Sequence, residues 1–135
     1  MEGEDLPGVV GVGVDAIEIV RVRLALARTP SLVERLWTAA EGVHCTAPDG
    51  DLRVGSLATR FAAKEAVAKA LGSGFHGFGF TDVEVVANAD GKPEVVLHAG
   101  AAARAEEEGI ARVHLSLSRT RDLALAQAVA VGAPR

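Results

Sequence analysis

Residues 52–74 read LRVGSLATRFAAKEAVAKALGSG, and the longest helical pattern in the chain runs from Leu52 to Leu71 within them, with Gly72 at the position of a C-cap glycine. Leu57, Phe61 and Leu71 share one stripe of an α-helix, and Glu65 falls within this apolar stripe. A carboxylate on an apolar face costs free energy unless it is paired or bound to a metal. The segment therefore predicts a long helix and makes Glu65 a candidate site residue.

A pair between Glu65 and Lys69, at positions i and i+4, is the ordinary alternative for this carboxylate. Such a pair contributes only about 0.2–0.5 kcal/mol on a helix surface. It would not require Glu65 to point toward the core, so the pair alone does not account for the position of the charge.

Basic residues flank the same stripe, and a glycine-rich loop follows it. The basic residues are Arg60, Lys64 and Lys69, and the loop of residues 72–79 begins with Gly72-Ser73-Gly74. Glycines let backbone amides approach phosphate oxygens, while lysine and arginine supply positive charge. The combination indicates a phosphate-binding edge, with a solvated basic face as the alternative.

The rest of the chain mixes strand and helix patterns without strict alternation. Expected strands cover residues 9–14, 83–86, 94–97, 113–118 and 123–131, although the alanines of the last segment would also suit a helix. A first helix is expected after Asp15, from Ile17 to Arg28, and a second over residues 32–37 with a capping box of Ser31 and Glu34. Further helices are expected from a start at Thr38 with Glu41 and over residues 99–108.

The turn at Asp90-Gly91 is expected to join two antiparallel strands. These patterns predict a single α+β domain over residues 8–135, with antiparallel strands packed against helices. A flexible tail over residues 1–7 is expected to precede it.

Asp15 follows the first expected strand and precedes the first expected helix. This position is typical of a helix N-cap, whose carboxylate accepts backbone hydrogen bonds. The glycines at positions 11 and 13, with Ala16, also fit a relaxed dinucleotide-binding pattern. That interpretation is weak, because Asp15 would face a pyrophosphate with no cation between them.

Composition and charge exclude several classes of protein. The net charge is −4 and the pI is near 5.5, whereas a general nucleic-acid binder usually carries a basic excess. No apolar run approaches the ~20 residues of a membrane span, and the acidic N-terminus does not resemble a secretion signal. Cys45 is the only cysteine, so no intrachain disulfide can form. We expect a cytoplasmic protein with neither a nucleic-acid nor a membrane partner.

Two further basic segments are candidates for binding. Arg21 and Arg28 are seven residues apart and therefore share a helix face, which suits docking of an acidic partner helix. Ser118, Arg119 and Thr120 form a polar strand end whose hydroxyl and guanidinium groups suit phosphate, although they also suit an ordinary turn.

Three stretches, taken in order, resemble the holo-acyl-carrier-protein synthase family of small 4′-phosphopantetheinyl transferases. They are Gly11-Val-Gly13-Val-Asp15-x-x-Glu18-Ile19-x-Arg21, Arg60-Phe-Ala-Ala-Lys-Glu65-Ala-x-x-Lys69-Ala-x-Gly72-x-Gly74 and Ser116-Leu-Ser118-x-Thr120. The second stretch is highly specific, whereas the glycine–aspartate motif alone would not be. The resemblance spans residues 9–131, nearly the whole chain.

This resemblance implies transfer of 4′-phosphopantetheine from coenzyme A to a serine of an apo-acyl carrier protein, with release of 3′,5′-ADP. It implies that Asp15 and Glu65 ligate Mg²⁺, that Lys69 neutralises phosphate charge, and that Glu65 is the candidate base. It places the contacts to coenzyme A, the co-substrate, at Arg60, Lys69, Gly72, Ser73, Gly74, Ser118, Arg119 and Thr120.

The resemblance also implies a homotrimer with active sites at the subunit interfaces, and it places Arg21 and Arg28 on the helix that receives the carrier protein. A chain with only 4% aromatic residues, whose core is therefore built from small side chains, is consistent with further burial in an oligomer.

The chain departs from the family pattern at Arg119, where the family usually has histidine. Arginine keeps a positive charge for a phosphate but cannot act as a base near neutral pH. A relative that binds the carrier protein or coenzyme A without catalysis is therefore the alternative function.

Overall fold

The computed structural model describes residues 8–133, so the expected tail over residues 1–7 lies outside the described residues. The elements in chain order are β1 (Val9–Glu18), α1 (Ile19–Arg28), α2 (Leu32–Leu36), α3 (Ala39–His44), α4 (Val54–Ala70), the 3-10 turn η2 (Phe80–Asp82), β2 (Val83–Ala87), β3 (Pro93–Leu97), α5 (Ala99–Glu107), β4 (Ile110–Arg119) and β5 (Leu123–Gly132). The strands form an antiparallel sheet of order β1-β5-β4 and a separate β2-β3 hairpin. The predicted α+β class is confirmed.

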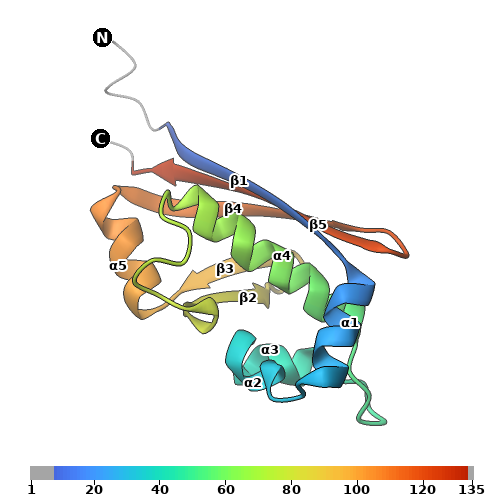
Figure 1. Ribbon diagram of the computed structural model, residues 1–135. Coiled ribbons are helices and arrows are strands. Elements are labelled where there is room, and N and C mark those ends of the chain that lie inside the picture. Colours follow the sequence, from blue (N-terminus) through green and yellow to red (C-terminus); the bar gives the residue numbers. More distant parts are fainter. Residues whose placement is uncertain (1–7, 134–135) are drawn as a thin grey trace.

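Helix α4 lies between the three-stranded sheet and the hairpin, and α1 to α3 gather at its N-terminal end (Figure 1). Its packing against the sheet uses very small side chains. The inward residues of β5 are Ala124, Ala126, Ala128 and Ala130, all fully buried, and α4 faces them with further alanines. Small side chains on both surfaces let the helix approach the sheet closely.

Two glycines of β1 make the approach closer still. A Cβ atom on Gly11 would overlap the backbone carbonyl of Ala70, and one on Gly13 would overlap that of Ala66. Side chains on a strand alternate between faces, so Asp15 points to the same side as these glycines, toward α4. The glycines thereby bring the carboxylate of Asp15 to the helix that carries Glu65.

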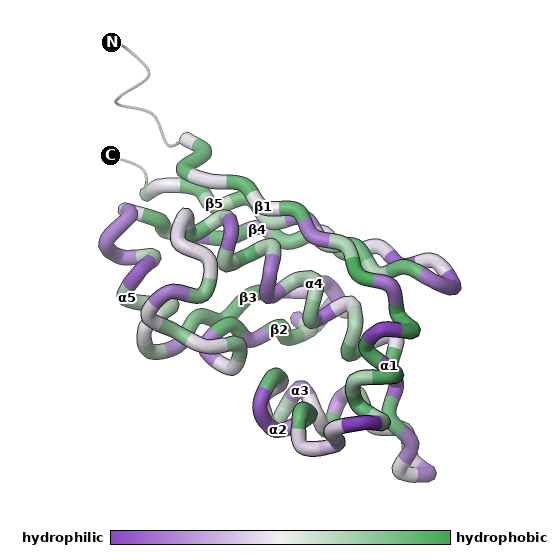
Figure 2. The backbone as a smooth tube through the Cα atoms, viewed as in Figure 1, coloured by the Kyte–Doolittle hydropathy of each residue, from purple (hydrophilic) through white to green (hydrophobic). Residues whose placement is uncertain are grey.

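The opposite face of the sheet is exposed, and it is apolar along β1 and part of β5. Val10, Val12 and Val14 of β1 are 44%, 62% and 56% exposed, and Leu125 of β5 is 40% exposed. Figure 2 shows hydrophobic residues along both strands, and no other element of residues 8–133 covers this face. An exposed apolar surface of this kind marks an interaction site.

The expected end of the first strand at Asp15 is wrong. Strand β1 continues to Glu18, because Asp15 pairs with Ala126 and Glu18 pairs with Leu123 on β5. The N-cap of α1 is Glu18, whose side chain makes no capping hydrogen bond. Asp15 is therefore not a helix cap. The glycines lie within a strand rather than in a turn, which also removes the dinucleotide-binding interpretation.

A second correction concerns the helix caps that follow. Ser31 precedes α2 but makes no side-chain capping bond, so the predicted capping box with Glu34 is wrong. The box predicted at Thr38 is present, because Glu41 N–H donates to Thr38 Oγ1 at 3.2 Å and Thr38 N–H donates to Glu41 Oε1 at 3.0 Å.

The remaining elements agree closely with the pattern. The Asp90-Gly91 hairpin is confirmed, residues 123–131 form a strand, and Gly72, with φ of 85°, follows α4 as expected. Cys45 is fully buried, and burial raises the pKa of its thiol. None of the helices among residues 8–133 is long and apolar enough to span a membrane.

Candidate functional site

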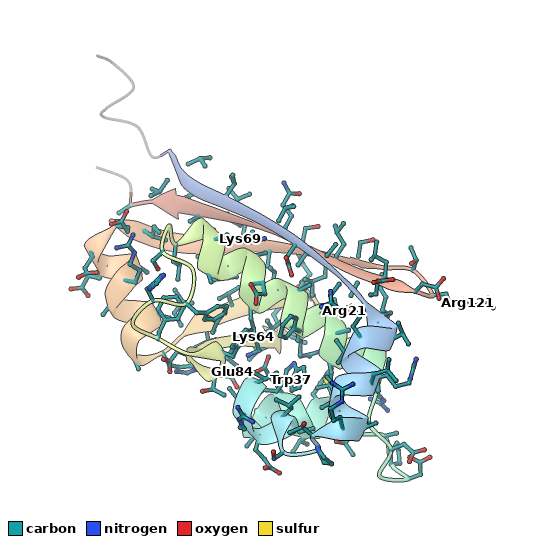
Figure 3. All side chains as sticks on the ribbon, in the orientation of Figure 1. Arg21, Trp37, Lys64, Lys69, Glu84 and Arg121 are labelled. Carbon is teal, nitrogen blue, oxygen red and sulfur yellow. The ribbon has the colours of Figure 1, made fainter. Side chains whose placement is uncertain are left out.

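Asp15 and Lys69 meet at the free edge of β1. The Lys69 ammonium donates to the Val14 carbonyl at 2.9 Å and to Asp15 Oδ1 at 3.2 Å. The side chain of Lys69 is 50% exposed and that of Asp15 is 21% exposed, so the pair is open to a ligand. Figure 3 shows Lys69 beside β1.

Glu65 belongs to the same cluster. Burial raises the pKa of Glu65, the nearby charge of Asp15 raises it further, and Lys69 acts in the opposite direction. Two carboxylates from distant parts of the sequence therefore face one space with a single lysine between them. The alternative pair of Glu65 with Lys69 does not form within residues 8–133, where Lys69 pairs with Asp15 instead.

This donor set fits a magnesium ion. Mg²⁺ is usually bound by one or two protein carboxylates together with phosphate oxygens and water. Glu65 and Asp15 supply two such carboxylates, and a divalent cation would relieve the repulsion from Asp15 that adds to the effect of burial on the pKa of Glu65. Across residues 8–133, no three His, Cys, Asp or Glu side chains are grouped to hold a metal without further ligands.

Lys64 is not part of the exposed basic edge that its spacing indicated. It is fully buried and donates to Glu41 Oε1 at 2.6 Å, to the Phe80 carbonyl at 3.0 Å and to the Val83 carbonyl at 2.5 Å. Burial lowers the pKa of the Lys64 ammonium, and Glu41 opposes that change. In Figure 3 Lys64 lies on the side of α4 away from Lys69.

The buried charge on α4 is thus Lys64, whereas Glu65 beside it is only half-buried. The helical pattern predicted that Glu65 would be the charged residue facing the core, but the buried one is Lys64, one position earlier. The prediction was wrong because the sequence shows no recognisable partner for Lys64. Glu41 was recognised only as a cap residue, and nothing in its spacing connected it with a lysine 23 positions away.

Arg60, one turn before Lys64, points toward the hairpin rather than toward Asp15. Its Nε lies 3.9 Å from Glu41 Oε2 and is buried without a hydrogen-bond partner. The residue lines a pocket of about 430 Å³ between the hairpin and β4, whose lining also includes His44, Lys92 and Ser116. Because no acidic residue lines this pocket, it suits an anion.

The glycine loop closes the end of α4. Gly72 N–H donates to the Lys69 carbonyl at 3.0 Å, and Gly74 N–H donates to the Ala68 carbonyl at 3.2 Å. These two amides cap the helix, so they do not point freely toward a phosphate. Ser73 lies between them and its hydroxyl donates to the Gly74 carbonyl at 3.0 Å.

Arg119 and Thr120 lie at the other end of α4. With Arg23, Arg53 and Arg121 they line a pocket of about 350 Å³ beside the first turn of the helix. The guanidinium group of Arg119 packs directly against Gly55, where a Cβ atom would come 2.5 Å from Nη1. Several arginines at a helix N-terminus favour an anion.

Ser118 lies apart from this pocket. It is exposed on β4 and, by strand alternation, shares the outer sheet face with Ser116. Arg21 and Arg28 are both exposed on α1, with the 57% exposed Leu24 between them, as the docking prediction requires.

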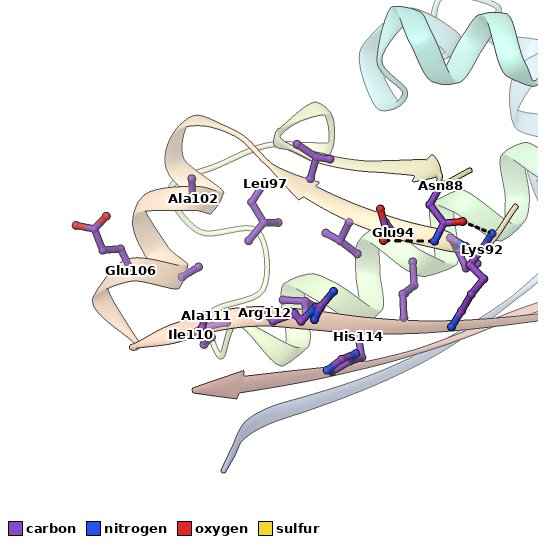
Figure 4. A pocket seen from close by; sticks show the side chains of 16 residues that line it. Asn88, Lys92, Glu94, Leu97, Ala102, Glu106, Ile110, Ala111, Arg112 and His114 are labelled. Atoms are coloured by element: carbon purple, nitrogen blue, oxygen red, sulfur yellow. Dashed lines mark hydrogen bonds between the residues drawn. The ribbon is translucent and has the colours of Figure 1, made fainter. Parts of the chain in front are cut away.

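One chain therefore brings together Asp15, Glu65 and Lys69, with Gly72–Gly74 at the end of the same helix, but it keeps Arg60 and Arg119 apart from them. A further groove of about 650 Å³ separates β3 from β4 beside α5 (Figure 4). None of the predicted site residues lines that groove.

The family model for the 4′-phosphopantetheinyl transferase superfamily matches residues 11–128, a range that includes every site described above. The chain belongs to this superfamily. The family identified from the three stretches of sequence is thereby confirmed, and the chain is an enzyme of the phosphopantetheinyl transferase type.

Curated members of the superfamily resemble the chain over most of their length. A holo-[acyl-carrier-protein] synthase of Clostridium perfringens is 42% identical over 128 residues, which cover 92% of this chain and 95% of the relative. One of Chloroflexus aurantiacus is 44% identical over 130 residues, covering 87% of this chain and 95% of the relative.

Solved transferase structures share the fold. The holo-[acyl-carrier-protein] synthase of Neisseria meningitidis superposes with a TM-score of 0.82 at 35% identity, covering 91% of this chain and 98% of that one. A Bacillus anthracis holo-(acyl-carrier-protein) synthase in complex with CoA (3′,5′-ADP) has a TM-score of 0.73 at 31% identity, covering 93% and 98%.

Proposed function

We propose that the chain transfers 4′-phosphopantetheine from coenzyme A to a serine of an apo-acyl carrier protein in the cytoplasm. The observation that carries the proposal is the convergence of Asp15, Glu65 and Lys69 at the edge of β1, within a chain of this transferase family. The Bacillus anthracis relative bound to coenzyme A supports the choice of substrate.

In the proposed reaction the serine oxygen attacks the phosphorus atom attached to pantetheine. A new P–O bond forms, the bond to the leaving phosphate breaks, and 3′,5′-ADP departs with the electron pair. Glu65 is the proposed acceptor of the serine proton, either directly or through a water molecule. Lys69 is close enough to neutralise charge on the diphosphate, and Mg²⁺ held by Asp15 and Glu65 supplies further neutralisation when bound.

The remaining coenzyme A contacts are assigned to two pockets. Arg60 offers a cation in the pocket beside the hairpin, and Arg119 and Thr120 offer charge and a hydroxyl at the start of α4. Ser118 and the loop of Gly72, Ser73 and Gly74 line neither pocket and are further proposed contacts, the loop at the end of α4 and Ser118 on β4. Arg119 binds phosphate in place of a histidine and takes no part in proton transfer.

The separation of these pockets from the Asp15 cluster supports active sites shared between subunits of a homotrimer. The exposed valines of β1 give such an assembly an apolar surface to bury. Val12→Asp should therefore produce a smaller species in light scattering, whereas Val43→Asp, at a 76% exposed valine of α3, should not. If only Val43→Asp produced a smaller species, the interface between subunits would lie at α3 rather than at β1.

Arg21 and Arg28 are proposed to receive an acidic helix of the carrier protein. Both side chains are exposed on one face of α1, and Leu24 between them adds an apolar contact. Complementary charge steers the encounter of two proteins and fixes their register.

The proposal is tested by incubating the protein with apo-carrier protein, coenzyme A and Mg²⁺ and then weighing the carrier. We expect the mass of phosphopantetheine to be added, and 3′,5′-ADP to appear in equal amount. Glu65→Gln should remove this gain while the protein stays folded. Binding of coenzyme A without any mass gain, on every fatty-acid or polyketide carrier tried, would favour the non-catalytic alternative.

A further inference from the structure

The buried carboxylate of Glu41 is held by groups from several elements. Its Oε1 accepts from Lys64 at 2.6 Å and from the Thr38 amide at 3.0 Å, and its Oε2 accepts from the Val85 amide at 3.1 Å. Glu41 is 1% exposed and Lys64 is 0% exposed. Both oxygens of this carboxylate therefore already accept short hydrogen bonds from groups other than Arg60.

Arg60 is left in an unusual position by this arrangement. Its Nε lies 3.9 Å from Glu41 Oε2, too far for a hydrogen bond, and has no other hydrogen-bond partner. Arginine beside a free carboxylate normally forms two short parallel hydrogen bonds. Here Lys64 and two backbone amides already occupy the carboxylate, so the guanidinium group keeps its charge for the pocket it lines.

Lys64 is the component that neutralises Glu41. Its ammonium has three protons and three acceptors, namely Glu41 and the carbonyls of Phe80 and Val83. Without Lys64 the carboxylate would be a buried, unpaired charge, and the nearest mobile cation is Arg60. The guanidinium group would then turn to Glu41 and leave the pocket.

We infer that Glu41 and Lys64 are positioning residues of the transferase, which act by keeping the guanidinium group of Arg60 available for a phosphate of coenzyme A. The inference rests on the proposed function, since it takes Arg60 as a coenzyme A contact. It assigns to the Glu41–Lys64 pair a role in substrate affinity in addition to its role in joining α3, α4 and β2.

The test compares four variants of the full chain: Lys64→Met, the neutral pair Glu41→Gln with Lys64→Met, Arg60→Ala, and Arg60→Ala with Lys64→Met. Calorimetry measures coenzyme A affinity independently of turnover, and steady-state kinetics measures KM for the carrier protein. Lys64→Met should weaken coenzyme A binding at least tenfold and leave KM for the carrier within twofold. The neutral pair should bind coenzyme A within threefold of the parent.

In the Arg60→Ala background, Lys64→Met should have no further effect, because its effect passes through Arg60. If the role were purely structural, Lys64→Met would lower the melting temperature in the parent and in the Arg60→Ala background alike. Its effect on coenzyme A affinity would then not depend on Arg60. Additive losses, or a folded Lys64→Met with unchanged affinity, would overturn the inference.

Should Lys64→Met fail to fold, the neutral pair decides the matter, since a tenfold loss of affinity in that variant contradicts the mechanism. If Arg60→Ala itself binds coenzyme A as tightly as the parent, the proposed contact at Arg60 is wrong. That outcome differs from failure of the inference alone, in which Arg60→Ala weakens binding but Lys64→Met either has no effect or adds a separate loss.

Discussion

Replacing Gly13 with alanine should both destabilise the protein and disable its candidate site. The new Cβ atom would overlap the backbone carbonyl of Ala66, which has no rotamer to change, so α4 must move away from β1. Overpacking of this kind costs about 1–3 kcal/mol. It outweighs the ~0.4–1 kcal/mol that alanine contributes by restricting the unfolded chain.

For a chain of this size, a net loss of about 1.3 kcal/mol corresponds to a fall of roughly 5 °C in melting temperature. Activity should suffer more than stability, because Asp15 is two residues further along β1 and its position relative to Glu65 depends on the helix. A displacement of ~1 Å commonly lowers turnover about a hundredfold.

Calorimetry and the carrier-mass assay measure the two effects of Gly13→Ala. Gly79→Ala is the matched control, because Gly79 has φ of −112° and no atom lies within 4 Å of the position that a new methyl group would take there. It should change stability by less than about 0.5 kcal/mol. If Gly13→Ala had the melting temperature and the turnover of the parent, the close contact between Gly13 and α4 would not determine the position of Asp15 relative to Glu65.

Three further predictions concern charged side chains. Glu65→Gln should raise the melting temperature of the metal-free protein in calorimetry at neutral pH, because a raised pKa of Glu65 means that the folded state disfavours its charged form. The difference from the parent should shrink as the pH falls and Glu65 of the parent becomes protonated. A lower melting temperature of the variant at neutral pH would contradict this prediction. The double variant Arg21→Glu with Arg28→Glu should raise KM for the carrier protein at least tenfold and leave KM for coenzyme A within twofold, whereas Arg35→Glu on α2 should change neither value. If the double variant and Arg35→Glu had equal effects, the carrier protein would dock elsewhere. Hydrogen bonds from Thr38 and then His98 lower the pKa of Glu84. The contribution of Glu84 to stability is therefore present above the usual carboxyl pKa and is lost as the pH falls through the lower pKa of the folded state. Glu84→Gln should flatten that part of an acid-unfolding curve, and an unchanged curve would refute the assignment.

Helix and strand periodicity predicted most of the fold correctly, because the core is made of long runs of small apolar residues. The helix over residues 54–70, the Asp90-Gly91 hairpin and the α+β class all follow from such local patterns. The end of β1 did not, since its last residues are held by pairing with β5 rather than by their own preference.

The candidate site was predictable only where family motifs named it. Asp15 and Glu65 come together through the contact of Gly11 and Gly13 with α4, which no spacing rule connects across fifty residues. The Glu41–Lys64 pair was missed for the same reason, because a buried ion pair is recognised only when both partners are seen. The proposed metal, trimer and docking roles remain predictions for experiment.

The valines at the start of β1 have a consequence for the behaviour of a chain that has not entered the proposed assembly. Residues 9–14 contain no charged side chain, and they lie in an edge strand of the sheet. An uncharged apolar strand with a free edge is a template for aggregation. A variant that weakens assembly should therefore lower the yield of recoverable protein during expression before any loss of specific activity is measured.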